Sequence, residues 1–279
     1  MRHLLREPLL ALGAAFALGP PAVLHFLATE RVAFGSASHV LFVGLSAGAA
    51  SAAAFALTAV GAKRQDGRTV VIATAFSVMA ALLVVHGLAT PGWLVGYEHD
   101  GVGAFSGAAT LPVGGALLAL CTVPAFRRPS AVQPLIVLQG LLLAAVAALG
   151  ATVLLAPTLV PAVPEPRSLP ALAALATGLA FYGLVGWRAV CTYRLTRRFT
   201  DLLVVIGVAW LAAALAAAML LAWWQLGWWI GHGLEVFGIG AIGASVAIDL
   251  RRAAQSRPLV GDLGAAELVR AEEAFLGAQ

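Results

Sequence analysis

Residues 202–222 read LLVVIGVAWLAAALAAAMLLA, an apolar stretch without a charged side chain. The hydrocarbon core of a bilayer is about 30 Å thick, so a helix needs about 20 apolar residues to cross it. This stretch therefore predicts a transmembrane helix. Similar stretches recur along the chain and predict an all-α, polytopic transmembrane helix bundle with eight spans, at residues 8–28, 37–62, 69–90, 104–126, 133–157, 169–191, 201–222 and 228–250.

The composition of the whole chain supports this fold class. Of its 279 residues, 61% are hydrophobic and only 11% are charged, and the mean hydropathy is +0.94. A soluble domain carries about 25% charged residues, so the composition excludes an ordinary soluble enzyme, a disordered chain and a secreted disulfide scaffold. We expect the lipid bilayer as the main partner. Nucleic acid is not expected, because the basic residues lie in short loops between spans.

The positions of the basic residues predict the topology. Cytoplasmic loops of membrane proteins are enriched in Lys and Arg, and with the N-terminus inside, only Arg31 and Arg167 fall in outer segments. Both termini are therefore predicted to be cytoplasmic, in a multi-pass protein of the inner (cytoplasmic) membrane. The basic residues of the inner segments are Arg2, Arg6, Lys63, Arg64, Arg68, Arg127, Arg128, Arg188, Arg194, Arg197, Arg198, Arg251, Arg252, Arg257 and Arg270.

The sequence divides into a transmembrane domain at 1–257 and a tail at 258–279. The tail has helix-forming residues and alternating charges, and Leu268 and Phe275 are seven residues apart. This pattern suits a short amphipathic helix in the cytoplasm. Two readings stay open: a solvated terminal helix, or a connector to a cytoplasmic signalling partner. Association of the whole protein into a homodimer is left open as well.

Ionisable side chains inside the spans are the candidate functional residues, because such groups are costly in a bilayer. His25, His39, His86 and His232 each lie within about one turn of the predicted outer end of a different span. Glu235 follows His232 by three residues and so shares its helix face. In one interpretation these five side chains converge on a ligand. In the other, the histidines are interfacial and bond to headgroups, water or backbone carbonyls.

Two kinds of cofactor suit such a cluster. Imidazole is the commonest metal ligand, which favours a transition metal such as zinc or copper, and a pair of histidines could hold a haem iron instead. Pro91 ends the third span, and Thr90 lies four residues after His86 on the same side. Met79 could add a soft ligand for copper. It lies about 10 Å deeper than His86, however, so packing is its expected role.

Parts of the sequence resemble a known signalling family. The matching stretches are HGLATPG at 86–92, GAKRQDGRT at 61–69, FSVMAA at 76–81, GAATLP at 107–112 and RPLVGDL at 257–263. They are similar to the N-terminal membrane sensor region of actinobacterial proteins that carry HD-GYP or GGDEF modules and turn over cyclic di-GMP. The resemblance implies a sensory role. The sequence has no GYP or GGDEF motif, so no catalytic residue is carried over, and we expect no hydrolysis of cyclic di-GMP.

These observations give one leading hypothesis and two alternatives. The leading hypothesis is an integral membrane sensory and signal-transduction module without a catalytic output domain. The first alternative is a zinc-dependent membrane hydrolase, similar in residue type to the ceramidase and progestin-receptor-like class. The second alternative, a small-solute transporter, is weaker because the inner halves of the spans are nearly all Ala, Leu, Val and Gly.

Overall fold

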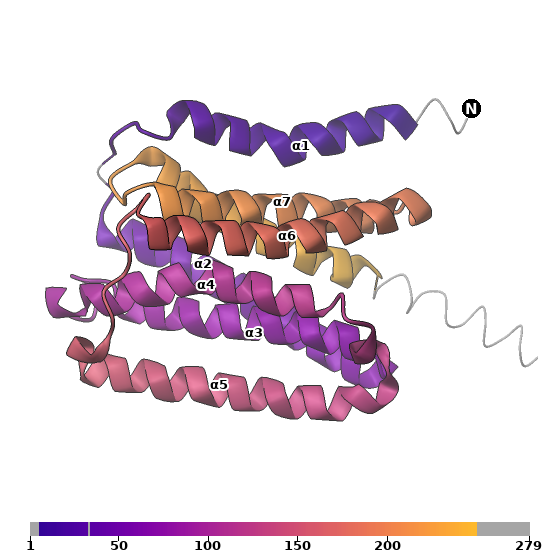
Figure 1. Ribbon diagram of the computed structural model, residues 1–279, viewed down its shortest axis with the longest axis horizontal. Coiled ribbons are helices and arrows are strands. Elements are labelled where there is room, and N and C mark those ends of the chain that lie inside the picture. Colours follow the sequence, from indigo (N-terminus) through magenta and orange to yellow (C-terminus); the bar gives the residue numbers. More distant parts are fainter. Residues whose placement is uncertain (1–5, 33, 250–279) are drawn as a thin grey trace, which may run out of the picture.

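The computed structural model describes residues 6–32 and 34–249. Within these residues the chain forms α-helices, joined by turns and short 3-10 helices, and no β-strand (Figure 1). The predicted all-α helix bundle is therefore confirmed. The helices are α1 (Arg6–Leu27), α2 (Ser36–Arg64), α3 (Gly67–Leu88), α4 (Asp100–Leu120), α5 (Val132–Leu155), α6 (Leu169–Thr196), α7 (Phe199–Leu220) and, after a short turn, a last helix at Leu226–Asp249.

Seven of the described helices are long and apolar enough to cross a membrane, as judged by length and composition. The apolar part of α1, Gly13–Leu27, is shorter. Each helix overlaps one of the stretches predicted from hydropathy, which supports a multi-pass membrane protein. The identity of the membrane and the cytoplasmic position of the termini stay predictions. The predicted tail at 258–279 lies outside the described residues.

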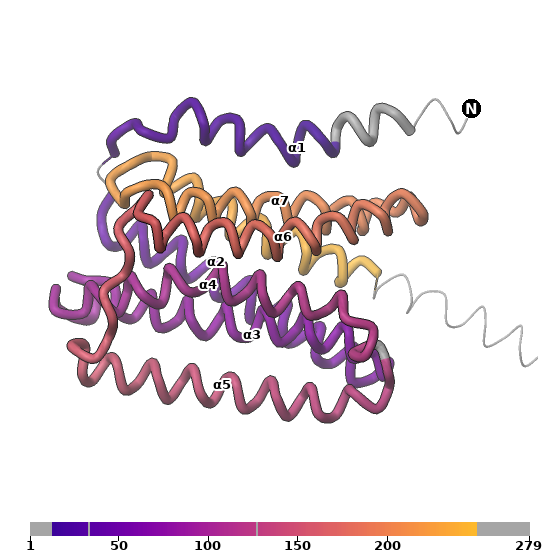
Figure 2. Tube along the Cα trace, in the orientation of Figure 1, coloured from indigo at the N-terminus to yellow at the C-terminus, as the bar shows by residue number. Residues whose placement is uncertain are grey.

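Successive helices run in opposite directions, so the connecting turns alternate between the two ends of the bundle (Figure 2). The turns after α1, α3, α5 and α7 gather at the end on the left of Figure 2. We call this the histidine end, because the helix termini that carry His25, His39, His86 and His232 meet there. It is the end that the distribution of basic residues predicts to face outward.

The buried core lies along α3. In the most apolar part of this helix 72% of the residues are buried, against 11% in α5. Phe76 and Met79 of α3 pack in one apolar cluster with Leu211 and Leu215 of α7 and Ile239 of the last helix. The helices α1 and α5 lie at opposite sides of the bundle (Figure 1). Their large exposed apolar side chains suit contact with lipid, among them Phe16, Leu18, Phe26, Leu141 and Leu149.

One buried polar network links the peripheral α5 to the core. Gln139 donates from Nε2 to Ser77 Oγ of α3 at 2.7 Å and to Thr58 Oγ1 of α2 at 2.9 Å. Thr58 also donates to the carbonyl of Ala54 at 2.8 Å. Hydrogen bonds between membrane helices contribute about 0.6 kcal/mol on average. The network therefore fixes the position of α5 on α2 and α3 more than it adds stability.

Two turns at the histidine end are joined by backbone hydrogen bonds. Leu226 N donates to Glu30 O at 2.7 Å, and Val32 N donates to Trp224 O at 3.0 Å. The turn after α1 is thereby held against the turn that precedes the last helix. As a result the start of α2 lies beside the start of the last helix, although the two are far apart in the sequence.

Candidate metal centre

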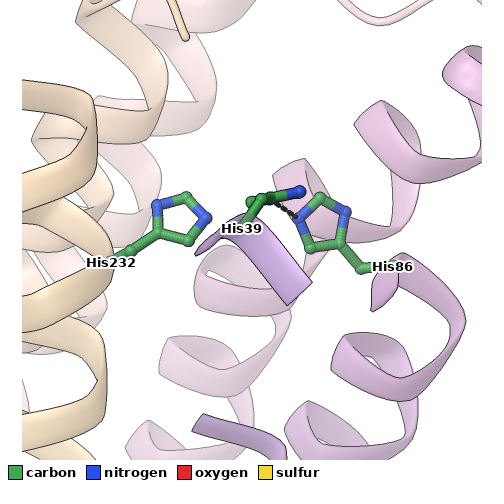
Figure 3. A group of neighbouring side chains, drawn as sticks. All are labelled: His39, His86 and His232. Atoms are coloured by element: carbon green, nitrogen blue, oxygen red, sulfur yellow. Dashed lines mark hydrogen bonds between the residues drawn. The ribbon is translucent and has the colours of Figure 1, made fainter. Parts of the chain in front are cut away.

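Three histidines from three helices meet at the histidine end. His39 is in the first turn of α2, His86 is in the last turn of α3, and His232 is in the second turn of the last helix. Figure 3 shows the three imidazole rings close together between their helices. Taking one ring nitrogen from each, all three nitrogens lie within 4.8 Å of one another. Among the described residues, this is the group of His, Cys, Asp or Glu side chains with the geometry of a metal site.

The spacing of the nitrogens fits a single small ion. His39 Nε2 and His86 Nε2 are 3.0 Å apart. The ring centroid of His232 lies 5.4 Å from that of His39 and 6.3 Å from that of His86. Zinc binds imidazole nitrogen at about 2.0–2.1 Å in a tetrahedral arrangement, which places two ligand nitrogens roughly 3.3 Å apart. The three nitrogens lie within 4.8 Å of one another, so their separations would change by about 1.5 Å or less to reach that spacing.

Backbone carbonyls orient two of the three rings. His86 Nδ1 lies 2.7 Å from Gly103 O, and His232 Nδ1 lies 3.2 Å from Trp228 O. A carbonyl can only accept, so each Nδ1 carries the proton and each Nε2 keeps its lone pair. A metal-binding histidine typically donates its second ring N–H to a carbonyl or carboxylate in this way. The two rings are thus held in the tautomer that a metal ion requires.

The position of His86 depends on a glycine of the neighbouring helix. A Cβ at Gly107 of α4 would lie 2.9 Å from His86 Cε1, closer than real side chains approach. Glycine at this position therefore lets the imidazole lie flat against α4, within reach of Gly103 O one turn away. His86 is only 7% exposed as a result, so its imidazole is well shielded from water.

Tryptophans form the outer wall of the cluster. The ring of Trp228 lies 4.0 Å from that of His232, and the ring of Trp229 lies 5.9 Å from that of His39. Trp229 is 5% exposed and donates from Nε1 to Trp223 O at 2.9 Å. The exposed side chains of Trp223 and Trp224 suit anchors at the interface between membrane and water. Trp229 does not suit this role, because it is buried beside the histidines.

The other two predicted site residues lie apart from the three histidines. His25 is exposed on α1, and its ring contacts the ring of Phe26. Glu235 is buried to 5% exposure, and its Oε1 has no hydrogen-bond partner within the described residues. Glu235 lies one turn deeper than His232, and side chains of an α-helix tilt toward its N-terminus. This tilt directs the Cα–Cβ bond of Glu235 toward the histidine end, but its carboxyl is not part of the three-nitrogen cluster.

The geometry separates the cofactors that the sequence left open. The 3.0 Å contact between the Nε2 atoms of His39 and His86 leaves no room for a macrocycle between them, which favours an ion over haem. Met79 packs against Gly114, whereas His86 packs against Gly107. Seven residues of helix α4 span about 10 Å, so the thioether lies well below the imidazoles.

Comparison of the chain with models of protein families, with curated proteins and with solved structures finds no match. The resemblance to the membrane region of HD-GYP and GGDEF proteins therefore stays a prediction.

Proposed function

We propose that this protein is an integral membrane sensor of a divalent transition metal ion, with zinc as the best fit. One observation carries the proposal: three imidazole nitrogens from α2, α3 and the last helix lie within 4.8 Å of one another. Borderline metals such as zinc and copper prefer imidazole, whereas calcium and magnesium prefer oxygen. Zinc imposes no geometry of its own, so it suits three ligands that approach from three separate helices.

The arrangement gives a physical route for a signal. A ligand shifts a conformational equilibrium only through its different affinities for the two states. An ion bound to His39, His86 and His232 favours the packing in which their three helices come closest at the histidine end. The last helix, which carries His232, runs from this end to the opposite one (Figure 1). In the proposed topology it would carry the change to the cytoplasmic side and the tail at 258–279.

Hydrogen exchange with and without zinc tests the sensor. We expect zinc to slow exchange at the ligands and also to change it at the far end of the last helix, at residues 240–249, because one helix joins the two. The segment of α5 at the same end of the bundle is the internal control, since α5 carries no ligand. Protection confined to the first turns around the three histidines would contradict the sensor and leave only a metal site.

A second function, zinc-dependent hydrolysis, is favoured by a separate observation. Three protein ligands leave a fourth position for water, as in catalytic zinc sites, and the buried Oε1 of Glu235 has no hydrogen-bond partner among residues 6–32 and 34–249. A zinc ion held by the three histidines would supply an activated water for attack on an ester or amide carbonyl. Glu235 would serve as the base that accepts the proton of that water and passes it to the leaving group.

The glutamate separates the two functions experimentally. If the protein is a hydrolase, Glu235→Gln lowers the turnover of a fluorogenic lipid ester by at least about a hundredfold, the size typical of losing a general base. Zinc binding should be retained, because Glu235 is outside the three-nitrogen cluster. Glu165→Gln, at a glutamate in the loop after α5, is the matched control. Zinc-loaded wild-type protein without ester or amide hydrolysis would contradict this second function.

A further inference from the structure

The imidazole of His39 differs from the other two because neither of its ring nitrogens has a backbone carbonyl as its hydrogen-bond partner. Its Nε2 faces His86 Nε2 at 3.0 Å, and its Nδ1 faces the hydroxyl of Thr90 at 3.3 Å. Both partners can accept a hydrogen bond, so each nitrogen of His39 has a neighbour that could receive its proton. Figure 3 shows the ring of His39 between the two other rings.

The contact with His86 restricts what His39 can do when no ion is bound. His86 Nδ1 is committed as a donor to Gly103 O, so His86 Nε2 presents a lone pair. A lone pair on His39 Nε2 at 3.0 Å would repel it. The favourable alternative places the proton of His39 on Nε2, which then donates to His86 Nε2. His39 Nδ1 is left as an acceptor that needs a donor.

The contact with Thr90 supplies that donor and also a second arrangement. The Thr90 hydroxyl has one proton, and it lies 3.3 Å from His39 Nδ1 and 3.2 Å from the carbonyl oxygen of His86. It can donate to His39, or it can donate to the His86 carbonyl and accept from His39 Nδ1–H. The second arrangement frees the lone pair of His39 Nε2 for a metal ion. Thr90 is 4% exposed, so water does not compete effectively for either bond.

We propose that Thr90 is a positioning residue whose hydroxyl changes partner when a metal binds. Without an ion it donates to His39 Nδ1 and completes a chain from Thr90 through His39 and His86 to Gly103. With an ion it turns to the His86 carbonyl, and the proton of His39 moves from Nε2 to Nδ1. No net proton is gained or lost by the site. This inference rests on the proposed metal site and adds the residue that adjusts it between two states.

Three variants test the role of Thr90 in binding. Thr90→Val removes the hydroxyl at nearly constant shape, and we expect zinc affinity to fall by about 10- to 100-fold, as for other partners of metal ligands. Thr90→Ser keeps the hydroxyl and should restore affinity close to that of the wild type. Thr74→Val is the matched control: Thr74 is a buried threonine of α3 whose hydroxyl bonds only the carbonyl four residues before it, at 2.9 Å. It should bind zinc like the wild type.

Nitrogen-15 NMR of histidine-labelled protein gives a readout that a purely structural role would not move. In wild-type protein we expect His39 to carry its proton on Nε2 without zinc and on Nδ1 with zinc. In Thr90→Val without zinc we expect the proton to stay on Nε2, because the contact with His86 remains. An Nδ1–H tautomer of His39 in the zinc-free wild type would overturn the inference, as would unchanged zinc affinity in Thr90→Val. If the wild type binds no zinc, the proposed function fails instead, and the zinc-free spectra still report whether His39 donates to His86.

Discussion

Replacing His86 with alanine is expected to lower the affinity for zinc by about a thousandfold, equivalent to about 4 kcal/mol. His86 is the most buried of the three ligands, and its Nδ1 bond to Gly103 O holds it in the metal-binding tautomer. Its loss leaves two imidazoles on two helices. Isothermal titration of purified protein in detergent measures the change.

His25→Ala is the matched control for this variant. His25 lies at the same end of the bundle, yet it is exposed and outside the three-nitrogen cluster. Its replacement should leave the affinity for zinc unchanged. Equal affinities of the two alanine variants would contradict the assignment of His86 as a ligand.

Zinc itself is expected to stabilise the folded bundle. An ion that binds only the folded state adds about 2.7 kcal/mol at a concentration of 100 times its Kd. For a chain of this size that raises the Tm by roughly 5–10 °C. The physical reason is that one ion ties together three helices whose ligands are far apart in the sequence. Thermal unfolding with and without zinc measures this shift in Tm. Addition of a chelator to the zinc-loaded protein should reverse the shift.

Magnesium is the control ion for this experiment. It prefers oxygen ligands in octahedral geometry and should not recognise three imidazoles. An equal shift in Tm with both ions would indicate a general effect of divalent cations on the charged loops. Such a result would contradict stabilisation through the three histidines.

Hydropathy alone located the helices closely, because crossing a bilayer demands a length of apolar chain that few other structures need. The stretch predicted at 201–222 is α7, Phe199–Leu220. The predicted and observed boundaries differ where a helix extends beyond its apolar stretch. The span predicted at 169–191 belongs to a helix that continues to Thr196, because arginines such as Arg194 end the apolar stretch without ending the helix.

For the candidate site, the sequence predicted how deep each histidine lies along its helix. It could not predict the rotation of each helix about its own axis, which decides whether the side chain faces inward. The four histidines of the spans do lie at one end of the bundle, because depth follows from counting residues along a helix. Whether each one faces inward depends on how the helices pack. His25 is on the peripheral α1, so it stays exposed. His39, His86 and His232 are on helices that adjoin one another at the histidine end.

Other parts of the site left weaker signals in the sequence. Trp228 precedes His232 by four residues, a spacing that places the two on one helix face, and the structure brings their ring centroids to 4.0 Å at a tilt of 41°. Gly107 and Gly103 follow the glycine spacing typical of close helix contacts. No sequence pattern could predict that the carbonyl of Gly103 is the hydrogen-bond partner of His86. That bond depends on the register of α4 against α3.

X-ray absorption at the zinc edge shows whether His39, His86 and His232 together hold one metal ion. Purified protein loaded with one equivalent of zinc should show three imidazole nitrogens at about 2.0–2.1 Å, and His86→Ala should show one fewer. A coordination shell made of oxygen or sulfur alone, or a protein that retains no zinc, would contradict the account.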